Sequence, residues 1–182
     1  MPWKNGGGST LEFAVDPEGA TLETGFRWRL SSAEVAQSGP FSSFPGMERW
    51  LLLLSGEGFE IDFGARGCAR LREPLQPIRF QGDWPAWASL VGGPSTDLGL
   101  MVDPRRVRAS LDVIRLDKNC LFRLDEGTTL FFVGTGTVSI PALDLHLGGN
   151  HLLRIENEAE ASVELAPGLT PVALVMVRLV SV

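Results

Sequence analysis

A polar, glycine-rich stretch near the start of the chain holds residues well suited to bind a ligand. Trp3, Lys4 and Asn5 follow Pro2 and precede glycines at positions 6–8. Glycine lets other groups approach the main chain closely, at an entropic cost that an ordinary surface loop has little reason to bear. Successive backbone N–H groups can also hold an anion. The segment is therefore predicted to contribute Trp3, Lys4 and Asn5 to a binding site, the alternative being a flexible terminal tail.

The elements that must position such a site are short β-strands. Apolar or alternating runs bounded by Gly, Pro, Asp and Ser recur along the chain, which is typical of an all-β sandwich or barrel. The predicted strands are residues 26–30, 49–54, 59–63, 68–72, 86–91, 97–101, 107–116, 130–133, 151–155, 162–165 and 172–180. Helical structure is predicted only as single turns at residues 31–34 and 104–107.

Composition favours a folded protein of the cytoplasm. The chain has 182 residues, of which 44% are hydrophobic and 21% charged, and this suits one large β domain or two small halves. No apolar run reaches the roughly 18 residues needed to cross a bilayer, and the start lacks the pattern of a secretory signal, so no membrane association is expected. The net charge of −6 argues against a nucleic-acid partner, because phosphate binding depends on clustered Lys and Arg.

A faint internal repeat divides the chain. Residues 52–58 and residues 130–136 share an apolar strand followed by Gly-x-Gly, and a second strand follows each of them. Both segments are predicted to form tight hairpins in which glycine supplies the turn geometry. The repeat predicts two related halves, residues 1–95 and 96–182, packed as one unit.

Several segments of the first half resemble the HutD/Ves family of cupin proteins. An apolar strand ending in Gly-x-Gly, followed some twenty residues later by Gly82, Asp83 and Pro85, resembles the spacing of a cupin barrel. The family resemblance spans about residues 2–103 and is carried by residues 2–8 (PWKNGGG), 28–31 (WRLS), 39–46 (GPFSSFPG), Arg49 and 97–101 (DLGLM).

This resemblance implies an all-β bicupin, which is two RmlC-like jelly-roll barrels in one chain. It also implies a bacterial protein linked to histidine utilisation or to a stress response, which binds N-formylglutamate or a similar acidic metabolite. Because cupins commonly pair through their sheet edges and unpaired edges need covering, a homodimer is expected.

The residues at the usual metal-binding positions of a cupin do not form a ligand set. If Gly56 closes the first cupin signature, the glutamate position falls on Arg49 and the histidine positions fall near Ser42 and Phe44. Zinc, iron and manganese need imidazole, thiolate or carboxylate donors, so neither a metal nor another cofactor is predicted. The same count back from Gly134 in the second half gives Gly127, Phe122 and Cys120.

The two histidines offer a weaker alternative for a metal. His146 and His151 lie five residues apart across a predicted turn, and Asp144 is nearby in the sequence. Paired histidines at a hairpin more often face solvent or make ordinary hydrogen bonds.

Arg49 is the strongest candidate for a ligand-binding residue. A guanidinium in place of an acid at a barrel mouth would turn a cation site into an anion site, and a bidentate pair with a carboxylate would orient the ligand. The alternative is an arginine whose stem packs on Trp50 or Phe44 and whose charged head lies in water.

Further candidates come from the same family segments. Strand alternation separates Trp28 from Arg29 and Ser31, and if the polar face lines the cavity then Arg29 and Ser31 contact the ligand. The aromatic residues Trp3, Phe44 and Phe80 are candidate walls of the pocket, although such side chains are more often core residues. Trp28 is a further ligand-binding candidate, and if it faces the core instead, Arg29 is merely exposed. Asp97 opens a family segment and is the remaining polar candidate, with a turn or capping role as the alternative.

Together these residues predict a protein that binds a small acidic metabolite and catalyses nothing. No catalytic residue is assigned. One alternative is a metal-independent isomerase or amidohydrolase that uses Asp83 or Asp97 as the base and Lys4 as the electrophile. Another is a structural or interaction protein whose barrels are vestigial.

Overall fold

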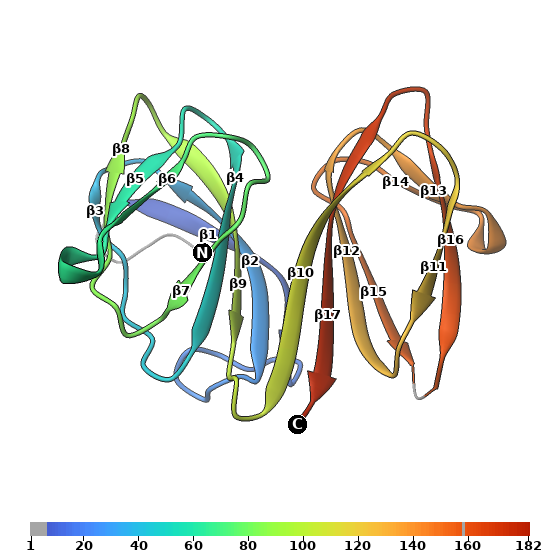
Figure 1. Cartoon of the computed structure of the whole chain (residues 1–182), viewed down its shortest axis with the longest axis horizontal. Helices are drawn as coiled ribbons and strands as arrows, with labels where there is room; N and C mark the ends of the chain where they lie inside the picture. Colours follow the sequence, from blue (N-terminus) through green and yellow to red (C-terminus); the bar gives the residue numbers. More distant parts are fainter. Residues whose placement is uncertain (1–6, 158) are drawn as a thin grey trace. The chain divides into compact units, whose positions relative to one another are not determined.

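The chain divides into two compact units, Met1–Arg106 and Val107–Val182 (Figure 1). The computed structural model describes residues 7–157 and 159–182. The predicted boundary after residue 95 differs from this division, because Ser95–Val102 forms strand β9 and pairs with two strands of the first unit. A strand held on both sides by main-chain hydrogen bonds belongs to the sheet that it completes.

The first unit is built from two antiparallel sheets. One sheet has the order β1-β2-β9-β4-β7 and the other has the order β3-β8-β5-β6. The strands are β1 (Gly8–Asp16), β2 (Trp28–Val35), β3 (Gly39–Pro40), β4 (Glu48–Ser55), β5 (Phe59–Asp62), β6 (Cys68–Leu71), β7 (Ile78–Gln81), β8 (Trp87–Leu90) and β9 (Ser95–Val102), with a 3-10 turn η1 (Gly64–Arg66).

The second unit also has two sheets, with the orders β10-β17-β12-β15 and β11-β16-β13-β14. Its strands are β10 (Val107–Leu116), β11 (Cys120–Leu124), β12 (Gly127–Thr135), β13 (Val138–Ile140), β14 (Leu145–Leu147), β15 (Leu152–Asn157), β16 (Ala161–Pro167) and β17 (Val172–Ser181), with a 3-10 turn η2 (Pro141–Leu143).

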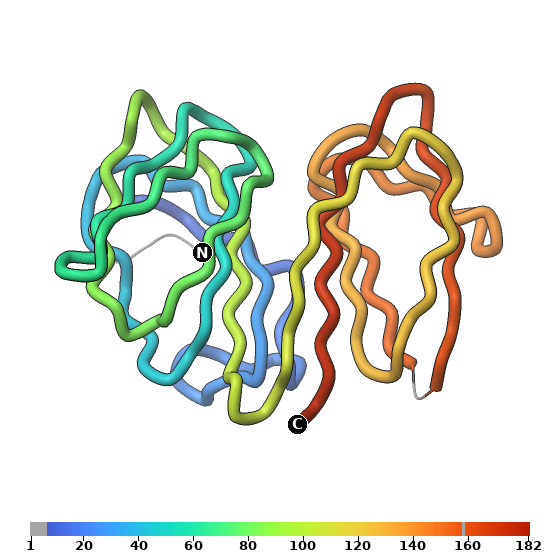
Figure 2. Tube along the Cα trace, viewed as in Figure 1, coloured from blue at the N-terminus to red at the C-terminus, as the bar shows by residue number. Residues whose placement is uncertain are grey.

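The two units follow the same path, which can be traced in the tube of Figure 2. When β2 to β9 are matched in order with β10 to β17, both strand orders of the first unit reproduce those of the second, and β1 is an addition to the first sheet. This arrangement of eight strands in two facing sheets is a jelly roll. The prediction of an all-β fold with two jelly-roll barrels is therefore confirmed.

The sequence repeat is present but its register is shifted. A bulge interrupts β4 between Leu53 and Ser55, and an equivalent bulge interrupts β12 between Val133 and Thr135. When the two bulges are aligned, Leu53 corresponds to Val133. The alignment that the Gly-x-Gly pattern suggests differs from this one by two residues.

Each unit has an apolar core between its sheets. Alternate residues of a strand point to opposite faces, so Leu51 and Leu53 of β4 point into the first core, which also contains Phe59 and Ile61 of β5. The segment at residues 31–34, predicted as a helical turn, lies within β2. Its residues pair with β1 on one side and with β9 on the other, so the sheet overrides the local capping signal.

Candidate functional site

The inner face of the first unit's large sheet gathers several of the predicted polar residues. Asp97 on β9 is the direct cross-strand partner of Leu53, a residue of the inner core. Arg49 lies on the same face as Leu53, four residues earlier on β4. Cross-strand partners share a face of the sheet. The face therefore carries three successive rows, which are Ala33–Asp97–Leu53, Ser31–Gly99–Leu51 and Arg29–Met101–Arg49.

Arg49 is a buried cation surrounded by aromatic rings. Its side chain leaves only 8% of the residue exposed, and its Nη1 donates a hydrogen bond of 3.3 Å to the carbonyl oxygen of Ser42. The guanidinium carbon lies 5.8 Å, 5.2 Å and 5.0 Å from the ring centroids of Phe41, Phe44 and Phe80. Distances below about 6 Å are those of cation–π contacts. The alternative in which the charged head of Arg49 lies in water is therefore wrong.

The charge of Arg49 has no direct counter-ion in the described part of the chain. Among residues 7–157 and 159–182, no carboxylate oxygen lies within 4.0 Å of its nitrogens. Burial lowers the pKa of Arg49 to about 10, and the electrostatic attraction of Asp97 opposes this effect. A buried charge is costly unless it is paired, so the arginine is poised to bind an anion.

Asp97 is the second buried charge of this face. Only 4% of the residue is exposed, and burial raises the pKa of its carboxyl to about 7. The positive charge of Arg49 and a hydrogen bond from the Ala33 backbone both lower this pKa and so offset part of the burial effect. The carboxyl group of Asp97 therefore loses its proton at a pH close to neutral.

Gly99 leaves room in the row between the two charges. A Cβ atom placed on this glycine would lie 3.7 Å from Leu51 Cδ1, 3.8 Å from the Ser31 carbonyl oxygen and 3.9 Å from Asp97 Oδ1. These are ordinary van der Waals distances, so no side chain fills the position. Gly99 also keeps accessible surface in the central strand of the sheet, while its neighbours Leu98 and Leu100 on the other face are 0% exposed. The room at this position, which is that of one methyl group, therefore lies on the inner face beside Leu51 and Asp97.

Arg29 is buried on the same inner face but is already neutralised. Its Nε lies 2.6 Å from Glu12 Oε2, and its side chain is 8% exposed. Glu12 is in the strand β1 that the first unit adds to the jelly roll, and it pairs with Ser31 in the register of β1 and β2. Arg29 and Ser31 thus share the face with Arg49, but the guanidinium of Arg29 is already paired with Glu12.

The other predicted site residues are only partly brought together. Phe44 and Phe80 contact the guanidinium of Arg49, as described above. Trp28 alternates with Arg29 and lies on the opposite face of the sheet, so it is not part of this inner group. Asp83, the alternative base, is exposed in the turn between β7 and β8. Trp3, Lys4 and Asn5 lie outside the described residues.

Three residues of the site were not singled out from the sequence. Phe41 lies in the same family segment as Phe44, two residues beyond Gly39, and the paired aromatics of that segment were its available signal. Glu12 could be found only by recognising β1 as a strand, and Gly99 only from the register of β9. Neither position carries a local pattern that points to a site.

The second unit provides an internal comparison for this site. Matching the bulges places Leu174 of β17 at the position of Asp97, and Thr129 of β12 at the position of Arg49. Met176 occupies the position of Gly99, and it belongs to the apolar core of the second unit. The second barrel thus has a leucine, a threonine and a methionine, all uncharged, where the first has two charges and a glycine.

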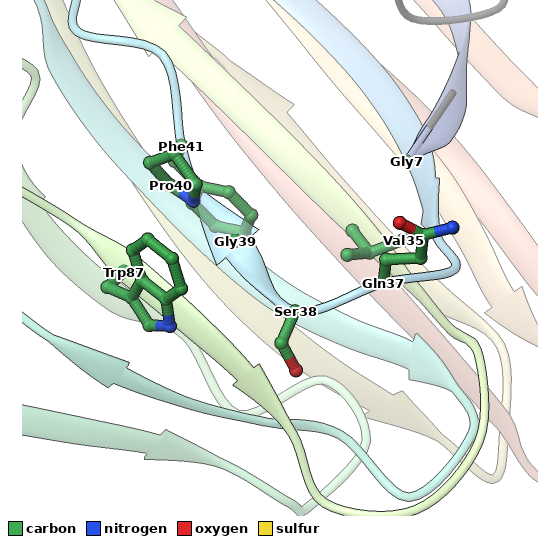
Figure 3. Close-up of a pocket in the computed structure, with 8 residues that line it drawn as sticks. All are labelled: Gly7, Val35, Gln37, Ser38, Gly39, Pro40, Phe41 and Trp87. Atoms are coloured by element: carbon green, nitrogen blue, oxygen red, sulfur yellow. The ribbon is translucent and has the colours of Figure 1, made fainter. Parts of the chain in front are cut away.

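A hollow of the first unit lies beside Trp87 of β8 (Figure 3). It has a volume of about 230 Å³ and is lined by Gly7, Val35, Gln37, Ser38, Gly39, Pro40, Phe41 and Trp87. Only Phe41 is shared with the surroundings of Arg49. Among the described residues, which begin at Gly7, none with a charged side chain lines the hollow, so the buried charges are a better candidate for the functional site.

The histidines and cysteines do not gather in the described part of the chain. His151 Nδ1 lies 3.1 Å from the Gly148 carbonyl oxygen, which is an ordinary turn contact, and His146 is in β14. Among the described residues, no three His, Cys, Asp or Glu side chains are grouped so that they could hold a metal ion. No helix among the same residues is long and apolar enough to cross a bilayer.

Known proteins similar to this chain come from bacteria. An uncharacterized 21.2 kDa protein from the hutC 3' region of Pseudomonas putida is 34% identical over 147 residues, which are 81% of this chain and 70% of that protein. Protein Ves of Citrobacter koseri is 38% identical over 112 residues, which are 61% of this chain and 56% of that protein.

Solved structures agree with the sequence matches. The structure of HutD from Pseudomonas fluorescens SBW25 has a TM-score of 0.86 and 32% identity, and the match covers 100% of this chain and 93% of that one. A Cupin 2 barrel protein from Leptotrichia buccalis has a TM-score of 0.64 at 6% identity, with coverage of 95% and 89%, and shows the fold alone. The HutD family model matches residues 1–170, and the chain therefore belongs to the HutD family.

Proposed function

We propose that this protein binds a small acidic metabolite inside its first barrel and does so without catalysis. The ligand would be an acid of the size of N-formylglutamate. Its carboxylate would bind to the guanidinium of Arg49, from which it would displace any water and complete the missing ion pair.

One observation carries this proposal. Arg49 is 8% exposed, and no carboxylate of the described residues lies within 4.0 Å of its nitrogens. An ion pair with a ligand carboxylate offers two parallel hydrogen bonds, which are about twice as strong as neutral ones. The three phenylalanine rings around the guanidinium exclude water and so strengthen the attraction further.

The contrast with neighbouring arginines supports the choice of Arg49. Arg29 already pairs with Glu12 at 2.6 Å, and Arg79 pairs with Glu48 at 2.6 Å on the outside of the unit. Arg79 also stacks on Trp50 at 4.8 Å, yet its side chain is 59% exposed. Arg79 is therefore a matched control, since it is an arginine on an aromatic ring but has its own partner and access to water.

Isothermal titration with N-formylglutamate and with glutarate tests the proposal. We expect binding to the wild-type protein, loss of at least tenfold in affinity for Arg49→Lys, which keeps the charge but not the planar fork, and a larger loss for Arg49→Met. Arg79→Met should bind as the wild type does. The proposal is refuted if the folded protein shows no binding heat and no thermal shift with either of these acids.

A role in the regulation of histidine utilisation is the biological part of this proposal. It rests on the family and on the position of the P. putida relative in the hutC 3' region. A cytoplasmic location and a homodimer remain predictions. Deletion of the gene in a bacterium that grows on histidine should change the growth or the expression of the histidine-degrading enzymes, and an unchanged strain would contradict the role.

A second function is favoured by the state of Asp97. Its pKa of about 7 suits a general base, which works best when its pKa is near the working pH. In that case the first barrel would be a metal-independent isomerase or amidohydrolase. Turnover of N-formylglutamate that is lost in a folded Asp97→Asn variant would favour catalysis, whereas recovery of the acid unchanged after long incubation with the wild-type protein would exclude it for this compound.

A further inference from the structure

We propose that the first barrel selects acids that also carry an N–H donor, with the ligand's carboxylate on Arg49 and its N–H donating to Asp97. This inference rests on the proposed function and names the class of ligand more closely. It predicts that an amide or amine N–H strengthens binding beyond what the negative charge alone provides.

The inner face carries two opposite charges, Arg49 and Asp97, that one ligand would contact. Arg49 and Asp97 lie in rows separated by the row of Ser31, Gly99 and Leu51. The partner of Arg49 on β9 is Met101, four residues from Asp97, and four residues of a strand span about 13 Å. The long side chain of Arg49 covers part of this separation, yet the two charged groups remain more than 4.0 Å apart. A ligand of several bonds can therefore touch both.

The free acceptor sites of Asp97 call for a donor. An ionised carboxylate has about four lone-pair sites. The hydrogen bond from the Ala33 backbone uses one of them, and no side chain of the described residues donates to this carboxylate. An acid without an N–H group would leave the oxygens of Asp97 unpaired. An N–H group would donate a hydrogen bond to these oxygens. A binding site discriminates most strongly between similar ligands when the wrong ligand leaves the buried polar groups of the site unpaired.

The space at Gly99 lies between the rows that hold Arg49 and Asp97. A methyl group would fit there at 3.7 Å or more from the nearest neighbours, so one carbon of a bound acid has room in this row. Both charges and this space are absent together from the second barrel, where Leu174, Thr129 and Met176 stand at the three positions. The three features therefore act as one group that only the first unit needs.

A pair of ligands that differ by one atom tests the inference. The first is N-formylglutamate and the second is the formyl ester of 2-hydroxyglutarate, in which an oxygen replaces the N–H. Both are titrated calorimetrically at pH 8.5, above the pKa of about 7 of Asp97, so that its carboxyl is ionised. We expect the wild-type protein to bind the ester at least tenfold more weakly, because the ester oxygen would face the carboxylate.

Variants of Asp97 show whether this residue makes the distinction. Asp97→Leu carries the residue found at the matching position of the second unit, and Asp97→Ala is a smaller change in case the leucine prevents folding. In either folded variant the two ligands should bind within twofold of each other. Double-mutant logic assigns the lost discrimination to contact between Asp97 and the N–H.

The outcomes separate this inference from the proposed function. Equal affinities of the two ligands for the wild-type protein would overturn the inference and leave the proposed function standing. No binding of either ligand to the wild-type protein would refute the proposed function and this inference with it. Full discrimination retained in both Asp97 variants would show that another group recognises the N–H, which also overturns the inference.

Discussion

Replacement of Asp97 by asparagine should stabilise the folded protein at pH 8 and change its stability little near pH 4. The carboxyl is 4% exposed and burial raises its pKa from 3.8 to about 7. The folded state therefore holds a proton that the unfolded state has already released between these two values. Stability is lost as the pH rises through this window, and the loss is complete above pH 7.

The size of the effect follows from the same two pKa values. Each pH unit of difference corresponds to about 1.4 kcal/mol, so the interval from 3.8 to about 7 gives an upper limit of about 4 kcal/mol. The neighbouring charges on the inner face are Arg49, Arg29 and Glu12. The pair of Arg29 with Glu12 does not involve Asp97, whereas Arg49 loses the attraction of Asp97 in the variant. Asparagine keeps the shape of the side chain but has no charge to bury, so the variant should lack this part of the pH dependence.

Denaturant unfolding from pH 4 to pH 8.5 measures the effect directly. The unfolding free energy of the wild-type protein should fall relative to Asp97→Asn as the pH rises, by between 1 and about 4 kcal/mol in total. Asp112→Asn is a matched control, because Asp112 is 53% exposed and pairs with Arg178 at 3.1 Å. Wild-type and Asp97→Asn curves that run parallel over the whole range would show that Asp97 is not held in the buried, protonated state near neutral pH.

Three other substitutions probe the same architecture. Arg49→Met should raise the pKa of Asp97 above about 7, because the arginine lowers it, and the pH-stability curve should shift to match; an unshifted curve would contradict the electrostatic link. Leu174→Asp should destabilise the second unit by about 3 kcal/mol or more in urea unfolding, because it places there a carboxyl without the arginine found in the first. Gly58→Ala should prevent stable folding, since its φ is +89° and the new Cβ would lie 1.8 Å from a backbone oxygen, whereas Gly93→Ala, with no atom within 4 Å, should leave the thermal midpoint unchanged.

The strands of the fold were largely readable from the sequence. Val107–Leu116 has the predicted bounds, and Glu48–Ser55 extends the predicted strand 49–54 by one residue at each end. Both are long apolar or alternating runs, whose pattern is local. Gly8–Asp16 was missed because its alternation is broken by a bulge between Glu12 and Ala14, and the two-residue strand Gly39–Pro40 is too short to carry a pattern. The predicted ranges also lack the short strands Ile78–Gln81, Cys120–Leu124, Val138–Ile140 and Leu145–Leu147.

The candidate site was readable only in part. Arg49 stood out from the sequence because a guanidinium occupied the position that holds a glutamate in the usual metal-binding signature of a cupin. Its burial among three rings, and the absence of a carboxylate beside it among the described residues, depend on which strands the sheet brings together.

The sequence by itself determined the class of the fold, the two related halves and the residue types available for binding, because alternation, turn residues and charge are properties of short segments. Only the tertiary structure decided that Arg49 and Asp97 share one face, that Arg29 is neutralised by Glu12, and that Gly99 leaves space between them. Register and bulges set these relations, and a shift by one residue would turn every side chain of a strand to the other face.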